Sequence, residues 1–417
     1  MPIHVFRQPF YKCLPVLLFT LNGCVASQAP MQKPDTNAIL VHAERVFDGN
    51  DFKTNTSVLI ENGKIARIDS RESFRHITAK EIDLGDATLL PGFIELHAHI
   101  GYHHIPGDTV LKHGITTVRD VGGPVHPPYG GDGSLRVLTS GPIITAPGGY
   151  PIPSLGETDI AIPVATAEDA RKTVRNLVEN GAAVIKVALE PGGEAGAPWN
   201  SEHGHGHPSA HHESGHQKPG LHRQWPLLPE RTVQAIVEEA HRLGRKVTAH
   251  IGESEGAELA INAHIDEWAH VPCAVIPETL LKKAVAQQVK IVTTIDTLSK
   301  CPGVVRNVQT LAGLGAEFLY GAEIAHPDIP WGIDAQELIY MMSVARMQPL
   351  DALRAATSKA GRQLNIPLLG TLQAGAPADM IAVKGNPVET PKILEYPDLI
   401  MSGGKIAVNN FEKSVDE

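Results

Sequence analysis

Residues 91–99 read Pro-Gly-Phe-Ile-Glu-Leu-His-Ala-His, an apolar run of buried-strand length that ends in two histidines one residue apart. In an extended strand alternate side chains point the same way, so His97 and His99 project from one face at the strand's C-terminal end. Two imidazoles held in this way can share a metal ion. A pair of polar histidines at the exit of a strand is the alternative, and further ligands at other strand ends decide between the two.

From residue 91 to residue 365 the chain alternates strand-like apolar runs with helical stretches. Such alternation predicts a parallel sheet, and eight repeats over this length predict a closed (β/α)₈ TIM barrel. The eight expected strands are residues 91–99, 114–120, 142–145, 183–187, 246–250, 265–270, 290–294 and 317–321.

The segments on either side of this repeat have strand and turn signals instead. Residues 38–90 contain short alternating runs and the hairpin signal Asn62-Gly63, with no helix-length periodic segment. Strand signals return in residues 366–411. We therefore expect the two chain ends to form one small β-sandwich domain into which the barrel, residues 91–365, is inserted.

The bulk composition describes a globular chain. It has 417 residues, of which 42% are hydrophobic and 20% charged, so it can bury a full-sized core. The net charge of −10 provides no basic surface and argues against a nucleic-acid partner.

The N-terminus has the order of features expected of a signal peptide. Basic residues precede an apolar run, residues 14–21, that is too short to span a bilayer, and Leu21-Asn22-Gly23-Cys24 follows. This sequence resembles a bacterial lipobox with an atypical Asn22. We expect a signal peptide over residues 1–24, a linker over 25–37 and membrane attachment through a lipidated Cys24, which places the protein in the bacterial cell envelope as a periplasmic or outer-membrane lipoprotein. Plain secretion is the alternative.

Cleavage and lipidation leave Cys273 and Cys301, which are too few for a disulfide framework.

Polar residues recur at the ends of the expected barrel strands. In this fold the C-terminal ends of the strands share the face that carries the active site. Imidazole and carboxylate ligands suit zinc or a similar divalent ion, and a lysine fits among them only if carbon dioxide has converted its amine to an anionic carbamate. The predicted metal ligands are His97, His99, Lys186, His250, His270 and Glu323.

These features together resemble the amidohydrolase superfamily, in particular the imidazolonepropionase-like branch that also contains metal-dependent Xaa-Pro dipeptidases. Imidazolonepropionases lack the metal-bridging lysine, so Lys186 favours the dipeptidase-like members. The motifs that carry the resemblance occur in the family's order and are Phe47-Asp48-Gly49, residues 62–65, Pro91-Gly92-Phe93 with His97 and His99, residues 114–120, Ala355-Ala356-Thr357 and residues 375–379.

The resemblance implies a two-metal centre. His97 and His99 would bind the more buried ion and His250 and His270 the other, with N6-carboxylysine at Lys186 and a hydroxide bridging two divalent ions, most simply Zn²⁺. The family has Gly-Thr-Asp after the eighth strand, where this chain has Gly321-Ala322-Glu323.

Glu323 is therefore the predicted metal ligand and catalytic base, with Asp328 as a nearby substitute for the carboxylate.

The implied reaction is hydrolysis of amide bonds in small molecules, with dipeptides or N-acyl amino acids as the substrate class. Hydrolysis of cyclic amides, lactones or esters is an alternative in the same fold. A non-catalytic His-rich metal-binding lipoprotein is a second alternative, and a homo-oligomer is left open.

Three further features of the sequence each allow two interpretations. Arg119 either grips a substrate carboxylate or forms an internal ion pair with Asp120, and Lys186 either bridges metals or pairs with Glu190. The His-rich loop, residues 198–222, either collects metal ions for the site or is an inert insertion.

Overall fold

The computed structural model describes residues 38–156, 159–200, 224–326 and 328–411. The predicted signal peptide, linker and Cys24 lie outside these residues, as do residues 201–222 of the His-rich loop. Within the described ranges, no helix combines the length and the apolar character needed to cross a membrane.

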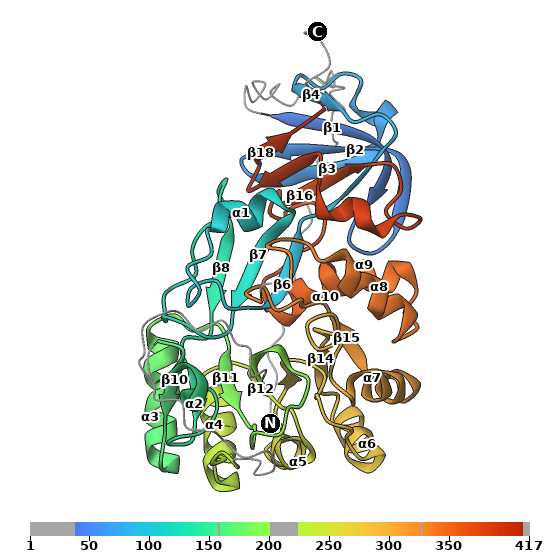
Figure 1. The fold of residues 1–417 in the computed structure, drawn as a ribbon. Helices are drawn as coiled ribbons and strands as arrows, with labels where there is room; N and C mark the ends of the chain where they lie inside the picture. The colour runs from blue at the N-terminus through green and yellow to red at the C-terminus, as the bar shows by residue number, and fades with distance from the viewer. Residues whose placement is uncertain (1–37, 157–158, 201–223, 327, 412–417) are drawn as a thin grey trace, which may run out of the picture. The chain divides into compact units, whose positions relative to one another are not determined.

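Strands from both ends of the chain form one eight-stranded sheet (Figure 1). The antiparallel pairing of β5 with β16 joins the N-terminal strands to the C-terminal ones, and the order is β18-β17-β16-β5-β1-β2-β3 with β4 beside β1. The strands are β1 (Ile39–Phe47), β2 (Phe52–Glu61), β3 (Lys64–Ser70), β4 (Lys80–Asp83), β5 (Ala87–Pro91), β16 (Met380–Lys384), β17 (Leu399–Ser402) and β18 (Lys405–Asn409).

This sheet curls until its outer strand β3 meets the segment that leads into β16. Ile65 donates its backbone N–H to the carbonyl of Ala376 at 2.9 Å, and Gly375 donates to the carbonyl of Ile65 at 2.8 Å. Val41 and Met401, from opposite ends of the chain, lie in the same apolar core. A sandwich-like core therefore arises from one hydrogen-bonded sheet.

The remaining strands are parallel and form the predicted barrel. Two hydrogen-bonded runs, β6-β7-β8 and β10-β9-β11-β12-β13-β14-β15, make up its wall. The strands are β6 (Phe93–Ala98), β7 (Ile115–Asp120), β8 (Arg136–Thr139), β9 (Ile143–Thr145), β10 (Ala161–Pro163), β11 (Ile185–Ala188), β12 (Val247–His250), β13 (Glu267–Trp268), β14 (Lys290–Val292) and β15 (Glu317–Leu319).

Two details of the barrel differ from the sequence-based expectation. The third position in the wall is shared by β8, which pairs with β7, and β9, which pairs with β11, whereas only residues 142–145 were expected there. The sixth strand shrinks to Glu267–Trp268. Because β8 and β9 share one position, the ring still has eight positions, and β10 is an addition beside β9. The predicted (β/α)₈ fold class is therefore confirmed.

Backbone hydrogen bonds close the ring between its first and last strands. His99 donates its N–H to the carbonyl of Ile324 at 3.0 Å, and Ile324 donates to the carbonyl of His97 at 3.2 Å. These bonds bring the residues after β15 against the C-terminal end of β6.

The Pro91-Gly92 step, between the end of β5 and the start of β6, is under a close steric constraint. A Cβ on Gly92 would lie 2.2 Å from the side chain of Thr116 on β7, so only glycine lets the two strands approach this closely. Gly92 also donates its N–H to the carbonyl of Asp379 at 3.0 Å, which ties the start of β6 to the curled sheet.

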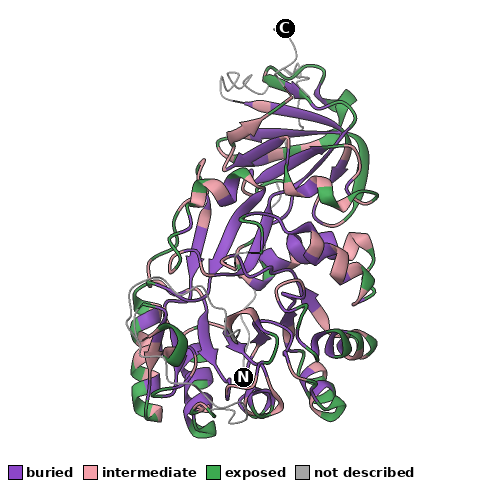
Figure 2. Ribbon diagram, viewed as in Figure 1, coloured by how far each residue is buried: buried purple, intermediate pink, exposed green. Residues whose placement is uncertain are grey.

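Amphipathic helices cover the barrel, with buried inner faces and exposed outer faces (Figure 2). On α3, for example, Val174 and Leu177 are buried, and the Thr166 hydroxyl caps the helix by accepting the N–H of Asp169. The helices are α1 (Gly107–Lys112), α2 (Ile152–Leu155), α3 (Ala167–Glu179), α4 (Glu230–Arg242), α5 (Ser254–Asn262), α6 (Glu278–Ala286), α7 (Val304–Gly313), α8 (Ala335–Ser343), α9 (Pro349–Ala356) and α10 (Ser358–Gln363), with 3₁₀ turns η1 (Arg71–Phe74), η2 (Pro198–Asn200) and η3 (Pro391–Glu395).

Candidate active site

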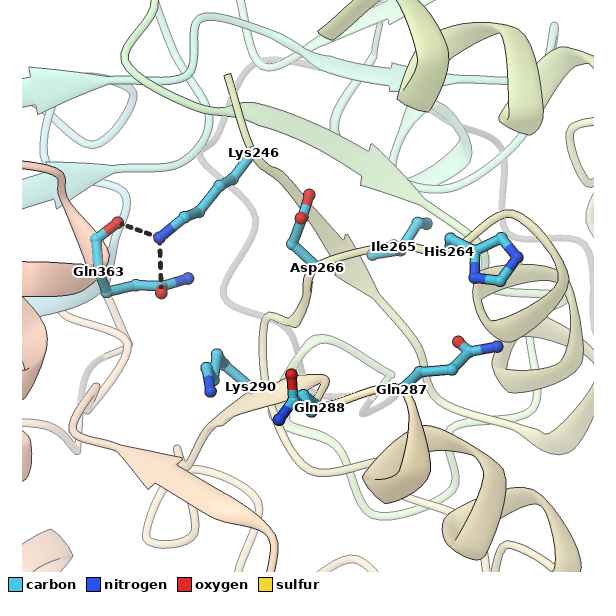
Figure 3. A pocket seen from close by; sticks show the side chains of 8 residues that line it. All are labelled: Lys246, His264, Ile265, Asp266, Gln287, Gln288, Lys290 and Gln363. Carbon is cyan, nitrogen blue, oxygen red and sulfur yellow. Dashed lines mark hydrogen bonds between the residues drawn. The ribbon is translucent and has the colours of Figure 1, made fainter. Parts of the chain in front are cut away.

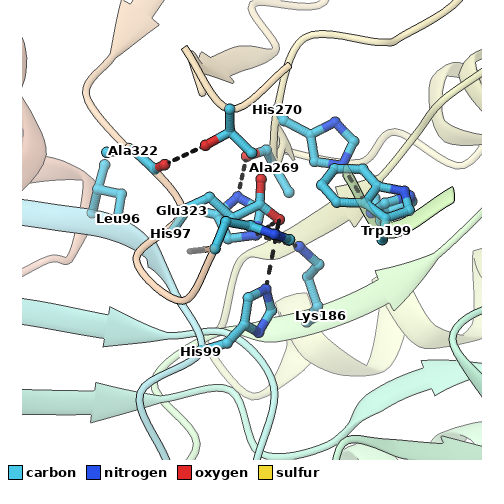
Figure 4. Close-up of polar contacts among 12 residues, drawn as sticks. Leu96, His97, His99, Lys186, Trp199, Ala269, His270, Ala322 and Glu323 are labelled. Carbon is cyan, nitrogen blue, oxygen red and sulfur yellow. Dashed lines mark hydrogen bonds and ion pairs between the residues drawn. The ribbon is translucent and has the colours of Figure 1, made fainter. Parts of the chain in front are cut away.

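One group of metal-ligand side chains lies where the barrel ring closes (Figure 4). His97 donates its Nδ1–H to the carbonyl of Ala269 at 2.6 Å, which leaves the Nε2 lone pair facing the barrel interior. The Glu323 Oε1 atom lies 3.6 Å from His97 Nε2 and 3.8 Å from His99 Nε2. A carboxylate and two imidazoles therefore converge on one point.

The backbone around Glu323 is held in an unusual conformation. Glu323 has a φ of +64°, in the left-handed region that residues with a Cβ seldom adopt. The buried Glu95 carboxylate accepts the N–H of His97 at 2.7 Å and that of Ala322 at 3.0 Å, so it holds the ends of β6 and the loop after β15 together. The longer side chain of Glu323 is aimed at the histidines by this strained turn.

A second group lies at the ends of β12 and β13. His270 Nε2 is 2.8 Å from His250 Nδ1, and His250 Nε2 is 3.0 Å from the Oε2 atom of Glu194. Glu194 was not among the predicted ligands, because it lies in the loop after β11, where no strand-end pattern marks it. The sequence did contain one signal: a second acidic residue comes shortly after Glu190, directly behind a Gly-Gly turn.

Lys186, on β11, comes close to the first group. Its Nζ atom is 3.4 Å from His97 Nε2. Its side chain is 1% exposed, and burial lowers the pKa of its amine to about 7. The alternative pairing with Glu190 is not observed, since one oxygen of Glu190 accepts the backbone N–H groups of Gly192 and Gly193 and the other has no partner.

All of the predicted metal ligands therefore gather at one end of the barrel, whereas Asp328, the predicted substitute for Glu323, is exposed and absent from both groups.

The protonation states of the buried groups suit metal binding. Burial holds the pKa of His97, His250 and His270 well below the usual range, so these imidazoles are neutral and offer lone pairs. Burial alone raises the pKa of Glu323, but the imidazoles of His97, His326 and His99 outweigh it, in part through hydrogen bonds from His326 and His99 to the ionised carboxylate, and keep that pKa well below its usual range. The site thus combines neutral imidazoles with an ionised carboxylate.

Several buried polar atoms at this end of the barrel lack a hydrogen-bond partner among the described residues. His97 Nε2 and Glu323 Oε1 are both acceptors, and two acceptors 3.6 Å apart repel unless a cation lies between them. Burial also raises the pKa of Glu194 to about 8, an electrostatic cost that a neighbouring cation relieves. The unpartnered atoms are His99 Nδ1, His270 Nδ1, Glu194 Oε1, Glu190 Oε2 and Glu323 Oε2. The residues therefore fit divalent metal ions.

Aromatic rings form a wall beside the second group. The Trp199 ring centroid is 5.4 Å from that of His250 and 5.8 Å from that of His270, and the Tyr150 ring stacks on His250 at 4.4 Å. Trp225 in turn stacks on Tyr150 at 5.5 Å. These rings exclude water from one side of the site, and they were not predicted from the sequence.

Arg119 has a structural partner that differs from the predicted one. Its guanidinium forms a two-pronged ion pair with Glu267 on β13, not with Asp120, and its Nε donates to the carbonyl of Leu96 at 2.8 Å. Gln363 donates to the same Glu267 carboxylate at 2.7 Å. Arg119 is 2% exposed, so the internal ion-pair interpretation holds and binding of a substrate carboxylate by Arg119 is excluded.

A disulfide bond joins Cys273, three residues after His270, to Cys301. It connects the loop after β13 to the segment that precedes α7.

A separate polar pocket of about 270 Å³ lies at the other end of the barrel (Figure 3). Lys246, Asp266 and Lys290 line it at the N-terminal ends of β12, β13 and β14. Its charges already have partners, since Lys246 donates to Gln363 and Lys290 to Glu317. Because catalytic residues of this fold lie at the opposite face, this pocket is not the candidate active site.

Most of the sequence matches a known protein family. Residues 88–408 fit the profile of the amidohydrolase family. The chain belongs to the amidohydrolase family. The match confirms the resemblance drawn from the motifs, and the prediction of a hydrolase acting on carbon–nitrogen bonds agrees with it.

Individual amidohydrolases resemble the chain in sequence and in structure. The ochratoxinase of Aspergillus niger is 30% identical over an alignment of 258 residues that covers 57% of this chain and 49% of that protein, so this chain spans about half the length of the curated relative. The crystal structure of A. niger ochratoxinase has a TM-score of 0.70 at 20% identity and covers 91% of this chain and 98% of its own. That of a Xaa-Pro dipeptidase with bound methionine has a TM-score of 0.68 at 22% identity, covering 89% and 99%.

Proposed function

We propose that this amidohydrolase cleaves amide bonds of dipeptides or N-acyl amino acids with the help of two divalent metal ions. One observation carries the proposal: two buried groups of imidazole and carboxylate side chains face each other at the C-terminal end of the barrel. His97, His99 and Glu323 would hold one ion, and His250 and His270 the other.

Bound divalent ions lower the pKa of a water ligand and polarise a carbonyl group. The chain's own residues supply the proton transfer and the surroundings. Glu323 is ionised and reaches the centre of the site, so it accepts a proton from the attacking water and delivers it to the leaving nitrogen. The rings of Trp199 and Tyr150 exclude solvent, which strengthens each electrostatic interaction at the reacting carbonyl.

The substrate class rests on two supports. The carbon–nitrogen specificity follows the family, and one protein of similar structure bears the name Xaa-Pro dipeptidase, which specifies a dipeptide. The ochratoxinase of A. niger, whose name specifies ochratoxin and not a dipeptide, supports testing amides beyond dipeptides, so N-acyl amino acids belong in the same test.

We further propose that Lys186 carries a carbamate and that zinc is the metal. Lys186 is buried beside His97, and its lowered pKa leaves a fraction of the amine unprotonated near neutral pH, the form that reacts with carbon dioxide. A Lys186→Gly variant should lose bound zinc and regain it when acetate or propionate fills the space. Incorporation of ¹³C-bicarbonate, followed by carbon NMR, detects the carbamate directly, and a wild-type spectrum without a carbamate signal would contradict it.

The main experiment is a hydrolysis assay on the zinc-loaded protein with a panel of dipeptides and N-acyl amino acids. Liquid chromatography with mass spectrometry measures the released amino acid. His97→Asn should reduce the rate of hydrolysis at least about 100-fold. It removes a proposed metal ligand, and stabilisation of the transition state depends on the bound metal. His264→Asn is the matched control, since His264 lies in the pocket at the opposite end of the barrel.

The same assay separates the alternatives. Turnover of cyclic amides, lactones or esters without turnover of any linear amide would replace the proposed substrate class. Bound zinc without turnover of any of these compounds would favour a non-catalytic metal-binding lipoprotein.

We also propose that the protein works in the cell envelope, attached through a lipidated Cys24. The order of basic residues, apolar run and Gly23-Cys24 supports export. The Cys273–Cys301 disulfide is the kind of bond that persists in oxidising compartments. Radiolabelled palmitate should label the wild-type protein in a bacterial host and leave Cys24→Ser unlabelled; equal labelling of both would refute lipidation at this residue.

A further inference from the structure

One oxygen of the Glu194 carboxylate contacts two aromatic side chains beside the site. Glu194 is 1% exposed in the loop after β11. Its Oε2 atom accepts the indole N–H of Trp199 and lies 3.0 Å from His250 Nε2. Two ring nitrogens therefore already occupy this oxygen.

The two nitrogens of His250 face different partners. Nδ1 is 2.8 Å from His270 Nε2, whereas Nε2 points to Glu194. A neutral imidazole has one N–H and one lone pair, and a carboxylate oxygen accepts only from the N–H. The contact with Glu194 thus favours the form of His250 that has a proton on Nε2 and a lone pair on Nδ1, beside His270.

We propose that Glu194 is a positioning residue that fixes the orientation and proton position of His250 and, through the same oxygen, holds the Trp199 ring against the site. The inference rests on the proposed metal centre, because it assigns Nδ1 of His250 to the ion shared with His270. A carboxylate that orients a metal-binding histidine in this way raises the basicity of the ligand and its affinity for the metal.

The surrounding loop is built to present Glu194. Glu190 accepts the backbone N–H groups of Gly192 at 2.6 Å and Gly193 at 2.9 Å, which fixes the turn immediately before Glu194. A Cβ on Gly252 would lie 2.5 Å from Glu194 Oε1 and 2.1 Å from Glu190 Oε2, so glycine at this position leaves room for both carboxylates. The approach of Glu194 to His250 is thus fixed from two sides.

The test compares zinc affinity in three variants, measured by competition with a coloured chelator on the intact protein. Glu194→Gln keeps an oxygen that can accept from His250 and Trp199, whereas Glu194→Met keeps the size and removes the acceptor. Glu253→Gln is the matched control, because Glu253 lies nearby, is only half-buried and forms no hydrogen bond with a described histidine. Circular dichroism verifies that each variant is folded.

We expect Glu194→Met to weaken binding of the second zinc ion by about 10- to 100-fold, the usual cost of losing such an orienting partner. Glu194→Gln should recover most of that loss, and Glu253→Gln should bind as the wild type does. Unchanged affinity in Glu194→Met overturns the proposal. An equal loss in Glu194→Gln and Glu194→Met also overturns it, because it would indicate that a charged oxygen binds the ion directly.

A cobalt titration gives a second readout. The visible absorption of the second Co²⁺ ion should keep its wild-type intensity in Glu194→Gln, since the ligand atoms are unchanged, and a lower-coordinate spectrum in that variant would count against the positioning role. Both readouts are independent of turnover. A protein that binds two ions but hydrolyses no amide refutes the proposed function and leaves this inference intact.

Discussion

Two groups of buried charged side chains lie inside the same barrel and differ in how completely their atoms are paired. In the Arg119–Glu267–Gln363 group, the guanidinium meets both carboxylate oxygens and the amide donates to one of them. In the group around His97 and Glu323, acceptors face acceptors, and buried nitrogen and oxygen atoms lack partners among the described residues.

The difference separates stability from function. Removing charge from water costs free energy in both groups. Only in the first group do ion pairs and hydrogen bonds within the protein offset this cost. The second is complete only with a ligand, which is why charged residues alone do not mark an active site. Unsatisfied buried charge is the more informative signal.

The largest expected effect is on catalysis in the unpaired group. Glu323→Gln keeps the shape of the side chain and removes the base, so kcat of the zinc-loaded protein should fall by about 10²- to 10⁴-fold. Glu323→Asp should also lose activity, because the left-handed backbone at this position aims a side chain one methylene longer. Steady-state kinetics measures kcat of both variants. Full activity in Glu323→Gln would mean that another group is the catalytic base.

The next effect is on stability in the paired group. Arg119→Met leaves the Glu267 carboxylate buried without its cation, which should cost about 3–5 kcal/mol in the free energy of unfolding. In the double variant Arg119→Met/Glu267→Leu the unpaired charge is gone, so most of the stability should return. Urea denaturation measures all three proteins. Equal stability of Arg119→Met and wild type would mean that this pair contributes nothing.

Acid pH should weaken the same pair. Burial raises the pKa of Glu267, but the charge of Arg119 outweighs it and keeps that pKa below its usual value. Because the folded-state pKa is the lower one, the stabilisation is present in full above the unfolded-state pKa of about 4.5 and is lost as pH falls through the folded-state value.

Glu267→Gln has no carboxyl to protonate at this position. Its free energy of unfolding should therefore fall less steeply than that of the wild type between about pH 5 and pH 3. Parallel slopes for the two proteins would show that Glu267 does not contribute to the acid response.

The smallest effect is expected for charges at the opposite end of the barrel. Lys290 is partly exposed and pairs with Glu317, so Lys290→Gln should change the free energy of unfolding by less than about 1 kcal/mol and leave kcat unchanged. A large loss of activity in this variant would give the pocket at the N-terminal ends of the strands a role that its paired charges do not suggest.

The sequence allowed prediction of features that repeat along the chain. Alternating strands and helices predicted the barrel, and His97, His99, His250 and His270 were found because strand ends of a barrel share one face. Lys186 and Glu323 followed from their positions on the same pattern.

Features that depend on contacts across the barrel were not predictable in this way. The partner of Arg119 is 148 positions away, and only the register of the closed ring brings Glu267 to it. Glu194 lies in a loop, where no period relates position to direction. The split between β8 and β9 also left no signal, since both are short runs of similar composition.

The closure of the ring between β6 and the residues after β15 ties the metal site to the completed fold. His97 and Glu323 lie far apart in the sequence, and the backbone bonds of Ile324 with His97 and His99 bring them together in the closed ring. An unfolded chain lacks this preformed arrangement of ligands and binds metal more weakly. Metal capture is therefore a late step, and an exported chain would draw its ions from the compartment in which it folds.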